Sequence, residues 1–265
     1  MTILYIGDIM GEVGLKLVED IIPELIKKNS IDLVIAQAEN VTDGKGLSLA
    51  DFNRLKKAGV DFCTGGNWTL QNKEIWPALS DKRQPIIRPA NYPADTPGLG
   101  YKTITKNNKK VLVISLLGKI VGKDSTKLID NPLIKVDQIL EEYKDERLDA
   151  IVVNFHGDYS SEKVIIGHYL DGRVSLVVGD HWHVPTADAR ILPNDTAHIS
   201  DVGMCGVLNA SLGVKFDSLI TRWKDNVPTR NVLETEGPKQ FNAVLIKTKD
   251  GLSEQIEAIN QIIKV

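Results

Sequence analysis

Two histidines separated by one residue, His181 and His183, offer a pair of metal-binding imidazoles directly after the apolar run Ser175–Val178. The run predicts a buried strand, so the pair lies at its carboxyl end. In an extended chain, residues i and i+2 point to the same side. We therefore expect both rings to face one point, as ligands of a metal ion would.

Other apolar runs end in residues of the same kind. Asp8 follows Ile3–Ile6, Glu39 and Asn40 follow the run that starts at Leu33, Asn67 follows Val60–Thr64, and His156 follows Leu148–Phe155. Taken singly, each could be a turn, capping or satisfied core residue. Ligands of open α/β sheets gather beyond the carboxyl ends of the strands, and there all of these residues would meet.

The combined set contains carboxylates, amides and imidazoles but no thiolate. Such mixed oxygen and nitrogen ligands suit Mn, Fe or Zn better than Ca²⁺ or Cu(I). The set exceeds what a single tetrahedral zinc ion needs, whereas two metal ions that share a bridging carboxylate would use all of it. Because two-metal sites are suited to phosphate esters, the set predicts a dimetal hydrolase.

Alternating strands and helices must position these ligands. Helical spacing predicts a helix through Leu15–Lys28, with a kink or boundary at Pro23, and Ser48 with Asp51 resembles a capping box that opens a helix at Leu49–Ala58. The remaining expected elements are a loop at 85–100, a strand at Lys110–Leu117, a helix at Val136–Tyr143, and a closing hairpin that starts at Phe241–Lys247 and turns at Asp250. This alternation predicts an α/β fold with a mainly parallel sheet covered by helices. No flexible linker divides the ligand-bearing segments, so we expect one domain over 1–265.

Bulk composition narrows the class of protein. The 265 residues are 42% hydrophobic and 25% charged, with a formal net charge of −3. This balance is typical of a soluble globular protein and gives no basic excess that would favour a stable nucleic-acid complex. The sequence has no signal-peptide start, no apolar run near the roughly 18 residues of a membrane span, and only two cysteines, Cys63 and Cys205. We expect a cytoplasmic protein without membrane partners, and a homo-oligomer is compatible with the sequence.

Two glycine-rich stretches do not predict nucleotide-binding loops. Gly7, Gly11 and Gly14 lack the spacing of a dinucleotide fingerprint, and the segment at Gly44–Gly46 is not a phosphate-cradling P-loop. We expect these glycines to allow tight turns beside the site.

Six segments identify a family resemblance: YIGDIMG, AENVTDGKGLS, GGNW, NFHGDYSSEK, GDHWHVPTADARILP and ISDVGM. In this order, over nearly the whole chain, they resemble the YmdB-like metallophosphoesterases, a branch of the calcineurin-like superfamily. The resemblance implies a four-layer α/β/β/α sandwich with a dimetal centre and phosphodiesterase activity, including activity on cyclic nucleotides. It also implies that Glu39 bridges the metals and that Asn40 lies close to the metals and the bound phosphate. The implied metal ligands are Asp8, Glu39, Asn67, His156, His181 and His183.

The chain departs from the family pattern at several positions. Trp68 stands where the family has a histidine that protonates the leaving group, and an indole cannot transfer a proton near neutral pH. Asn154 replaces an aspartate, while Asp180, Trp182 and Pro185 are atypical around the two histidines. These departures affect the expected catalytic power and substrate preference rather than metal binding.

Our first hypothesis is a phosphodiesterase that depends on two divalent metal ions (Fe, Mn or Zn) and hydrolyses a small phosphodiester or nucleotide with a metal-activated water. The acid role at Trp68 then passes to His198, to solvent or to no group. The alternative is a catalytically weakened regulatory protein that binds metal and nucleotide, in which Trp68 stacks on a base. A structural or adaptor protein without metal is the third hypothesis.

Overall fold

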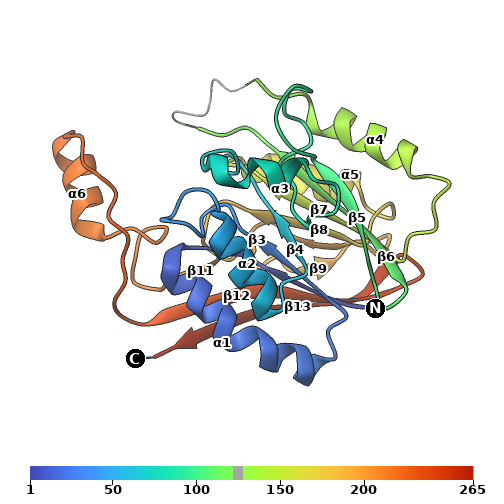
Figure 1. Ribbon diagram of the computed structural model, residues 1–265, viewed down its shortest axis with the longest axis horizontal. Coiled ribbons are helices and arrows are strands. Elements are labelled where there is room, and N and C mark those ends of the chain that lie inside the picture. Colours follow the sequence, from blue (N-terminus) through green and yellow to red (C-terminus); the bar gives the residue numbers. More distant parts are fainter. Residues whose placement is uncertain (122–127, 265) are drawn as a thin grey trace.

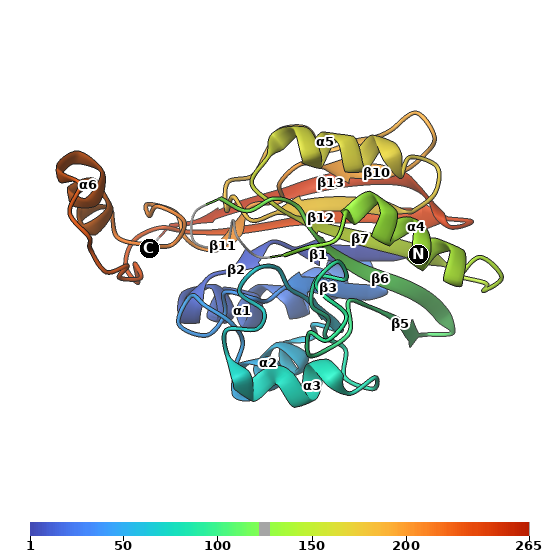
Figure 2. The same cartoon turned by 90° about the horizontal axis from the view of Figure 1, so that it is seen from above.

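Both faces of the central strands are apolar, so each sheet must be covered on both sides. In β1 (Thr2–Ile6), Ile3 and Tyr5 belong to the hydrophobic cluster between two sheets, whereas Leu4 and Ile6 belong to a cluster beneath helices. The computed structural model describes residues 1–121 and 128–264. It shows the predicted four-layer α/β/β/α sandwich, in which two sheets pack face to face between two layers of helices (Figures 1 and 2).

The first sheet joins the two ends of the chain. Its strand order is β2-β11-β12-β1-β3-β4, and β13 also pairs with β12. The strand β12 is antiparallel to β1, β11 and β13, while β3 and β4 continue in parallel from β1. The bounds are β2 (Asp8–Ile9), β3 (Leu33–Gln37), β4 (Phe62–Thr64), β11 (Met204–Val207), β12 (Lys239–Lys249) and β13 (Leu252–Ile263). The segment β12 thus lies between β11 and β1, where the carbonyl of Asn242 accepts the N–H of Gly7 at 3.1 Å.

Three helices and a short 3₁₀ turn pack on the outer face of the first sheet: α1 (Gly11–Asn29), α2 (Leu49–Ala58), η1 (Lys73–Ile75) and α3 (Trp76–Ser80). The helix α1 continues through Pro23, so of the two alternatives expected there the boundary is wrong and the kink stays a prediction. The hydroxyl of Ser48 caps α2 by accepting the N–H of Asp51 at 3.1 Å, as predicted. Apolar side chains such as Phe52 and Leu55 fix this layer against the sheet.

The second sheet carries the remaining ligand-bearing strands. Its order is β5-β6-β7-β8-β10-β9, and β6, β7, β8 and β10 are parallel. The strands are β5 (Tyr101–Lys106), β6 (Lys109–Leu117), β7 (Ala150–His156), β8 (Leu176–Asp180), β9 (Arg190–Ile191) and β10 (Ala197–Ile199), and the helices α4 (Pro132–Glu142) and α5 (Ser160–Tyr169) cover them. At their carboxyl ends, β7 and β8 run one and two residues further than predicted, so His156 and Asp180 are their last residues.

One element stands apart from the layers. The helix α6 (Phe216–Asp225) projects from the body on two connecting segments (Figures 1 and 2). None of its residues, all of which the structure describes, is buried. Within the described parts of the chain, no helix combines the length and apolar character that a membrane crossing requires.

Candidate metal centre

The carboxyl ends of the parallel strands of both sheets meet at one edge of the sandwich, and the predicted ligands gather there. Glu39, His156 and His181 each place a ligand atom within 4.8 Å of those of the other two. The Nε2 atom of His156 is 3.0 Å from Oε1 of Glu39 and 2.8 Å from Oδ1 of Asn67. These four side chains form a first ligand group.

Asp8 and His183 form a second ligand group beside the first. Their Oδ1 and Nε2 atoms are 3.6 Å apart, and both residues are buried. The other oxygen of Asp8, Oδ2, accepts the backbone N–H of His181 at 3.2 Å. The two groups are therefore joined through the segment that holds both histidines.

Several buried polar atoms in and beside these groups have no hydrogen-bond partner among the described residues. They include Oδ1 of Asp8, Oδ1 of the neighbouring Asn40 and Nδ1 of His183. A buried polar atom without a partner costs about 1–3 kcal/mol, so such atoms call for an explanation. Burial raises the pKa of Asp8, but His183 beside it lowers that pKa to about 2, so the carboxylate is ionised. An ionised carboxylate, an amide oxygen and an imidazole nitrogen without partners are the donor set of a divalent metal ion.

The histidine pair reaches the site by a route that the sequence did not predict. His181 and His183 have φ angles of 100° and 61°, in the left-handed region, so the segment is not extended and the alternation argument is wrong. The ring of His181 packs edge-on against that of His156, with centroids 4.4 Å apart, and its Nε2 is 3.2 Å from Oδ1 of Asp158. Two successive turns, rather than strand geometry, thus bring both imidazoles to the site.

A buried ion pair holds this turn segment in place. Lys163 of α5 donates to the backbone carbonyl of Asp180 at 2.6 Å and to Oδ2 of Asp201 at 2.7 Å. The same carboxylate oxygen accepts the backbone N–H of Trp182 at 2.9 Å, between the two histidines. The Lys163 and Asp201 side chains are both fully buried. The attraction between their charges therefore stabilises the histidine-bearing segment in addition to the hydrogen bonds.

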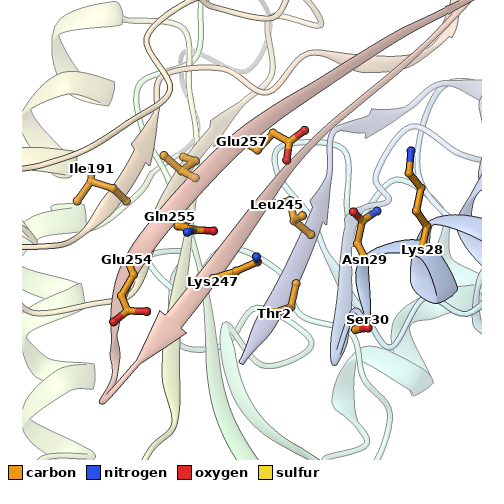
Figure 3. Close-up of a pocket in the computed structure, with 11 residues that line it drawn as sticks. Thr2, Lys28, Asn29, Ser30, Ile191, Leu245, Lys247, Glu254, Gln255 and Glu257 are labelled. Carbon is orange, nitrogen blue, oxygen red and sulfur yellow. The ribbon is translucent and has the colours of Figure 1, made fainter.

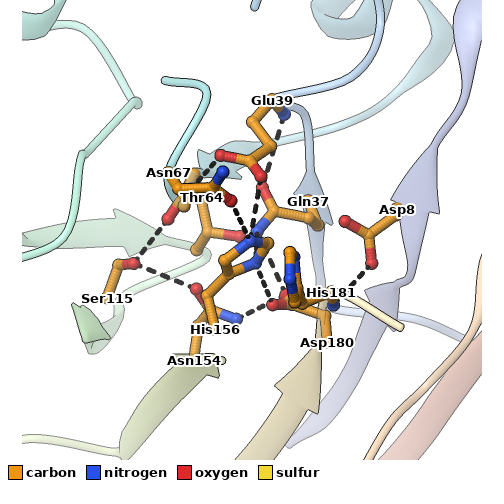
Figure 4. A network of polar contacts seen from close by, with 12 residues as sticks. Asp8, Gln37, Glu39, Thr64, Asn67, Ser115, Asn154, His156, Asp180 and His181 are labelled. Atoms are coloured by element: carbon orange, nitrogen blue, oxygen red, sulfur yellow. Dashed lines mark hydrogen bonds and ion pairs between the residues drawn. The ribbon is translucent and has the colours of Figure 1, made fainter. Parts of the chain in front are cut away.

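Asp180 organises the base of the first ligand group (Figure 4). Its Oδ1 is 2.7 Å from Nδ1 of His156, and its Oδ2 accepts from the Tyr5 hydroxyl at 3.0 Å, the Gln37 amide at 3.2 Å and the Asn154 amide at 2.5 Å. Burial and then Asp8 raise the pKa of Asp180 to about 6, in part offset by His156. A carboxylate behind a ligating imidazole fixes its tautomer and orientation.

Sequence reasoning singled out Asp180 and Asn154 only as unusual positions. The structure shows that these two departures contact each other, since one amide donates to one carboxylate. The signal in the sequence was that Asn154 lies two residues before His156 and Asp180 lies one residue before His181. Both positions therefore support a ligand rather than supply one.

The loop after β4 wraps around Glu39. Its Oε2 accepts the backbone N–H groups of Gly66 at 2.6 Å and Trp68 at 2.7 Å. A Cβ atom at Gly66 would lie 2.3 Å from Cδ2 of His156, so only glycine allows the imidazole and the loop to approach this closely. The position of Glu39 is thus fixed by backbone donors.

The predicted catalytic residues lie in different places. The Asn40 side chain donates to the carbonyl of Gly44 at 2.9 Å and lies beside the ligands. Trp68 is half-buried at the cavity wall, with Nζ of Lys45 4.7 Å from its ring centroid. His198 is buried on β10 under α5, with Nδ1 3.2 Å from the carbonyl of Val177. A side chain enclosed on that face cannot meet a substrate at the ligands, so the acid role considered for His198 is wrong.

A cavity of about 570 Å³ opens over the ligands. Its wall includes Glu39, Asn40, Trp68, His181 and His183 together with residues of α6. A separate hollow of about 800 Å³ lies at the amino end of β1, beside the end of α1 and the start of β13 (Figure 3). Of these two cavities, the one at the ligands is the candidate substrate site.

Comparisons with known proteins agree with this arrangement. Residues 4–259 match the family model described as YmdB-like protein. A Bacillus subtilis protein named 2',3'-cyclic-nucleotide 2'-phosphodiesterase is 39% identical over 250 residues, which cover 94% of this chain and 92% of that protein. A crystal structure of a phosphatase from Mycoplasma pneumoniae has a TM-score of 0.91 at 29% identity and covers 100% of this chain and 94% of that one. A 5'-nucleotidase precursor from Thermus thermophilus is similar in fold alone, with a TM-score of 0.61 at 14% identity over 100% of this chain and 54% of that one.

Proposed function

Because the chain belongs to the YmdB-like family, we propose that it is a metal-dependent hydrolase of phosphate diesters, with 2',3'-cyclic nucleotides as its substrate class. The observation that carries this proposal is the pair of adjacent ligand groups with partnerless buried atoms. The name of the Bacillus subtilis relative supports the substrate class.

The residues fit two divalent metal ions. Asp8 and His183 would hold one ion, while Asn67, His156 and His181 would hold the other, and Glu39 lies where a carboxylate could serve both. Mixed oxygen and nitrogen ligands without thiolate suit Fe, Mn or Zn. Such ions, when bound, supply positive charge that activates water and stabilises negative charge on the phosphoryl oxygens.

The chain's own side chains prepare the site for an anionic ester. An ionised Asp180 favours the His156 tautomer in which Nδ1–H donates to Oδ1 of Asp180, and Nε2 then faces Glu39 and Asn67. The ammonium group of Lys45, over the ring of Trp68, lines the cavity and attracts a phosphate anion. These groups bind and orient a substrate before any bond is broken.

Trp68 limits which esters the proposed enzyme can hydrolyse efficiently. Its indole N–H donates a hydrogen bond but cannot release a proton near neutral pH. The proton for a leaving alkoxide then has to come from solvent. We expect efficient hydrolysis of esters with a good leaving group and slower hydrolysis of esters that need protonation.

The test combines metal content with turnover. Purified protein is analysed for bound metal and assayed with Mn²⁺ or Fe²⁺ on bis(p-nitrophenyl) phosphate, whose leaving group needs no acid, and on 2',3'-cyclic AMP. The proposal predicts bound metal and turnover that disappears in His183→Gln, while His168→Gln, an exposed histidine on α5, retains it. Metal-loaded protein that turns over neither ester would refute the proposal.

Trp68 favours a second candidate function. A protein that binds metal and nucleotide without turnover would use the tryptophan as a stacking surface. This regulatory function predicts nucleotide binding by calorimetry with no hydrolysis of either ester. The two turnover assays, together with calorimetry, therefore separate the candidates.

A further inference from the structure

The helix α6 presents an apolar face that the described chain covers only at Leu219, which packs against Met10, Met204 and Val214. Phe216, Leu219, Ile220 and Trp223 recur at helical spacing, and the side chain of Trp223 is 85% exposed. A helix normally buries such a stripe, and contiguous exposed apolar surface marks a binding site more often than chance. The face of α6 therefore calls for an occupant.

The position of this face restricts what the occupant can be. All four apolar residues line the same 570 Å³ cavity as Asn40, His181 and His183. That volume lies within the roughly 300–1,000 Å³ of small-molecule sites. An occupant that covers α6 thus reaches the proposed metal ligands with its other end, as one molecule with an apolar part and an anionic part would.

The body of the protein adds an aromatic side chain to the wall of this cavity. Trp68 lines the cavity from the body of the protein, so two of the chain's four tryptophans border this single space. Lys45 places its ammonium group 4.7 Å from the Trp68 ring centroid. Flat aromatic surfaces beside a cation match a planar base attached to a phosphate, because any nucleobase can stack on an aromatic ring.

We infer that Trp68 and the apolar face of α6 form a subsite for the nucleobase of a nucleotide whose phosphate lies at the metal centre. The inference rests on the proposed function and deepens it, since it assigns base recognition to a projecting helix. Stacking does not distinguish bases strongly, so adenine and uracil nucleotides are both accepted.

The experiment compares a substrate with and without its base. We measure kcat/KM for 2',3'-cyclic AMP and for ribose 2,3-cyclic phosphate with the wild type, Trp223→Ala and Val227→Ala. Val227 is an exposed apolar residue just beyond α6 that does not line the cavity, so it is the matched control. The wild type and Val227→Ala should prefer the nucleotide. Trp223→Ala should lose about 10-fold on the nucleotide and nothing on the ribose ester, in line with the loss of one stacking contact.

Binding without turnover provides the second readout. Calorimetry with adenosine 3'-monophosphate and with inorganic phosphate should show that Trp223→Ala weakens only the nucleotide. This keeps the subsite testable if the wild type hydrolyses neither ester, a result that would refute the proposed function alone. Equal wild-type kcat/KM for both esters would overturn the subsite. An equal loss on both esters in Trp223→Ala, with a dimer that dissociates in light scattering, would also overturn it, because the face would then belong to a second copy of the chain.

Discussion

Replacing Asp180 by asparagine tests whether a buried carboxylate behind His156 prepares the metal centre. The carboxylate accepts from four donors, the ring nitrogen of His156 on Oδ1 and the side chains of Tyr5, Gln37 and Asn154 on Oδ2. An amide of the same shape has one oxygen acceptor and one NH₂ donor. Asp180→Asn therefore cannot satisfy both sides at once.

The arrangement of donors predicts which side the amide satisfies. If its NH₂ group replaced Oδ2, it would face three donors, whereas at Oδ1 it faces only Nδ1 of His156. The second orientation forces Nδ1 to accept, so the ring proton moves to Nε2, the atom near Glu39 and Asn67. A protonated Nε2 cannot ligate a metal.

The expected loss is about 10–100-fold in metal affinity, the usual effect of removing the partner of a ligating histidine. This corresponds to about 1.4–2.7 kcal/mol of binding free energy. Affinity is measured by competition of Zn²⁺ with a chelator, and the tautomer of His156 by long-range ¹H–¹⁵N NMR of the metal-free and zinc-loaded proteins.

The matched control is Asp188→Asn. Asp188 is a half-buried carboxylate that accepts from Thr186 and Ser200 and contacts none of the proposed ligands. Metal affinity should be unchanged in this variant. Equal affinities in Asp180→Asn and wild type, with Nδ1 still protonated, would refute the reasoning.

Three further outcomes follow from the site and its support. Trp68→His should raise kcat for 2',3'-cyclic AMP by about 100-fold, the low end of general acid catalysis, and leave kcat for bis(p-nitrophenyl) phosphate unchanged, while the weaker stacking raises KM for the nucleotide. Equal effects on both kcat values would show that Trp68 does not occupy the acid position. Lys163→Met leaves Asp201 buried without its cation, so urea unfolding should show a loss of about 3–5 kcal/mol, and a loss below about 1 kcal/mol would contradict this role. Burial raises the pKa of Cys63 and Cys205 to about 12. A thiol reagent at pH 8 should therefore modify them only when the protein unfolds. Rapid labelling of the native protein would show that the two thiols are not enclosed.

The layers of the fold could be predicted from sequence because each central strand is apolar on both faces. The pattern of Ile3–Ile6 fits only a strand that is covered on two sides, and the strand ends then carry the ligands to one edge. The helix α6 was not predicted, although Phe216, Leu219, Ile220 and Trp223 have helical spacing. Its position over the ligands depends on the connecting segments, which no local pattern specifies.

The support of the ligands could not be predicted, because it depends on register and on distant charges. The parallel pairing of β7 with β8 sets His156 beside Asp180, and a shift of the register would separate them. The turns at His181 and His183 depend on Lys163 and Asp201, which come from α5 and from beyond β10. Local alternation predicted an extended pair, and tertiary contacts overrode it.

The insertion of β12 between β11 and β1 also determines when the centre can form during synthesis. All the proposed ligands leave the ribosome before Lys239–Lys249 exists, yet β1 has only β3 as a neighbour until that segment arrives. Gly7, next to Asp8, gains its backbone partner from Asn242 only then. A nascent chain that ends after α6 therefore carries every ligand and an open sheet edge. Maturation of the metal centre therefore requires β12, because the strand that leads to Asp8 is paired on both sides only after β12 has been added.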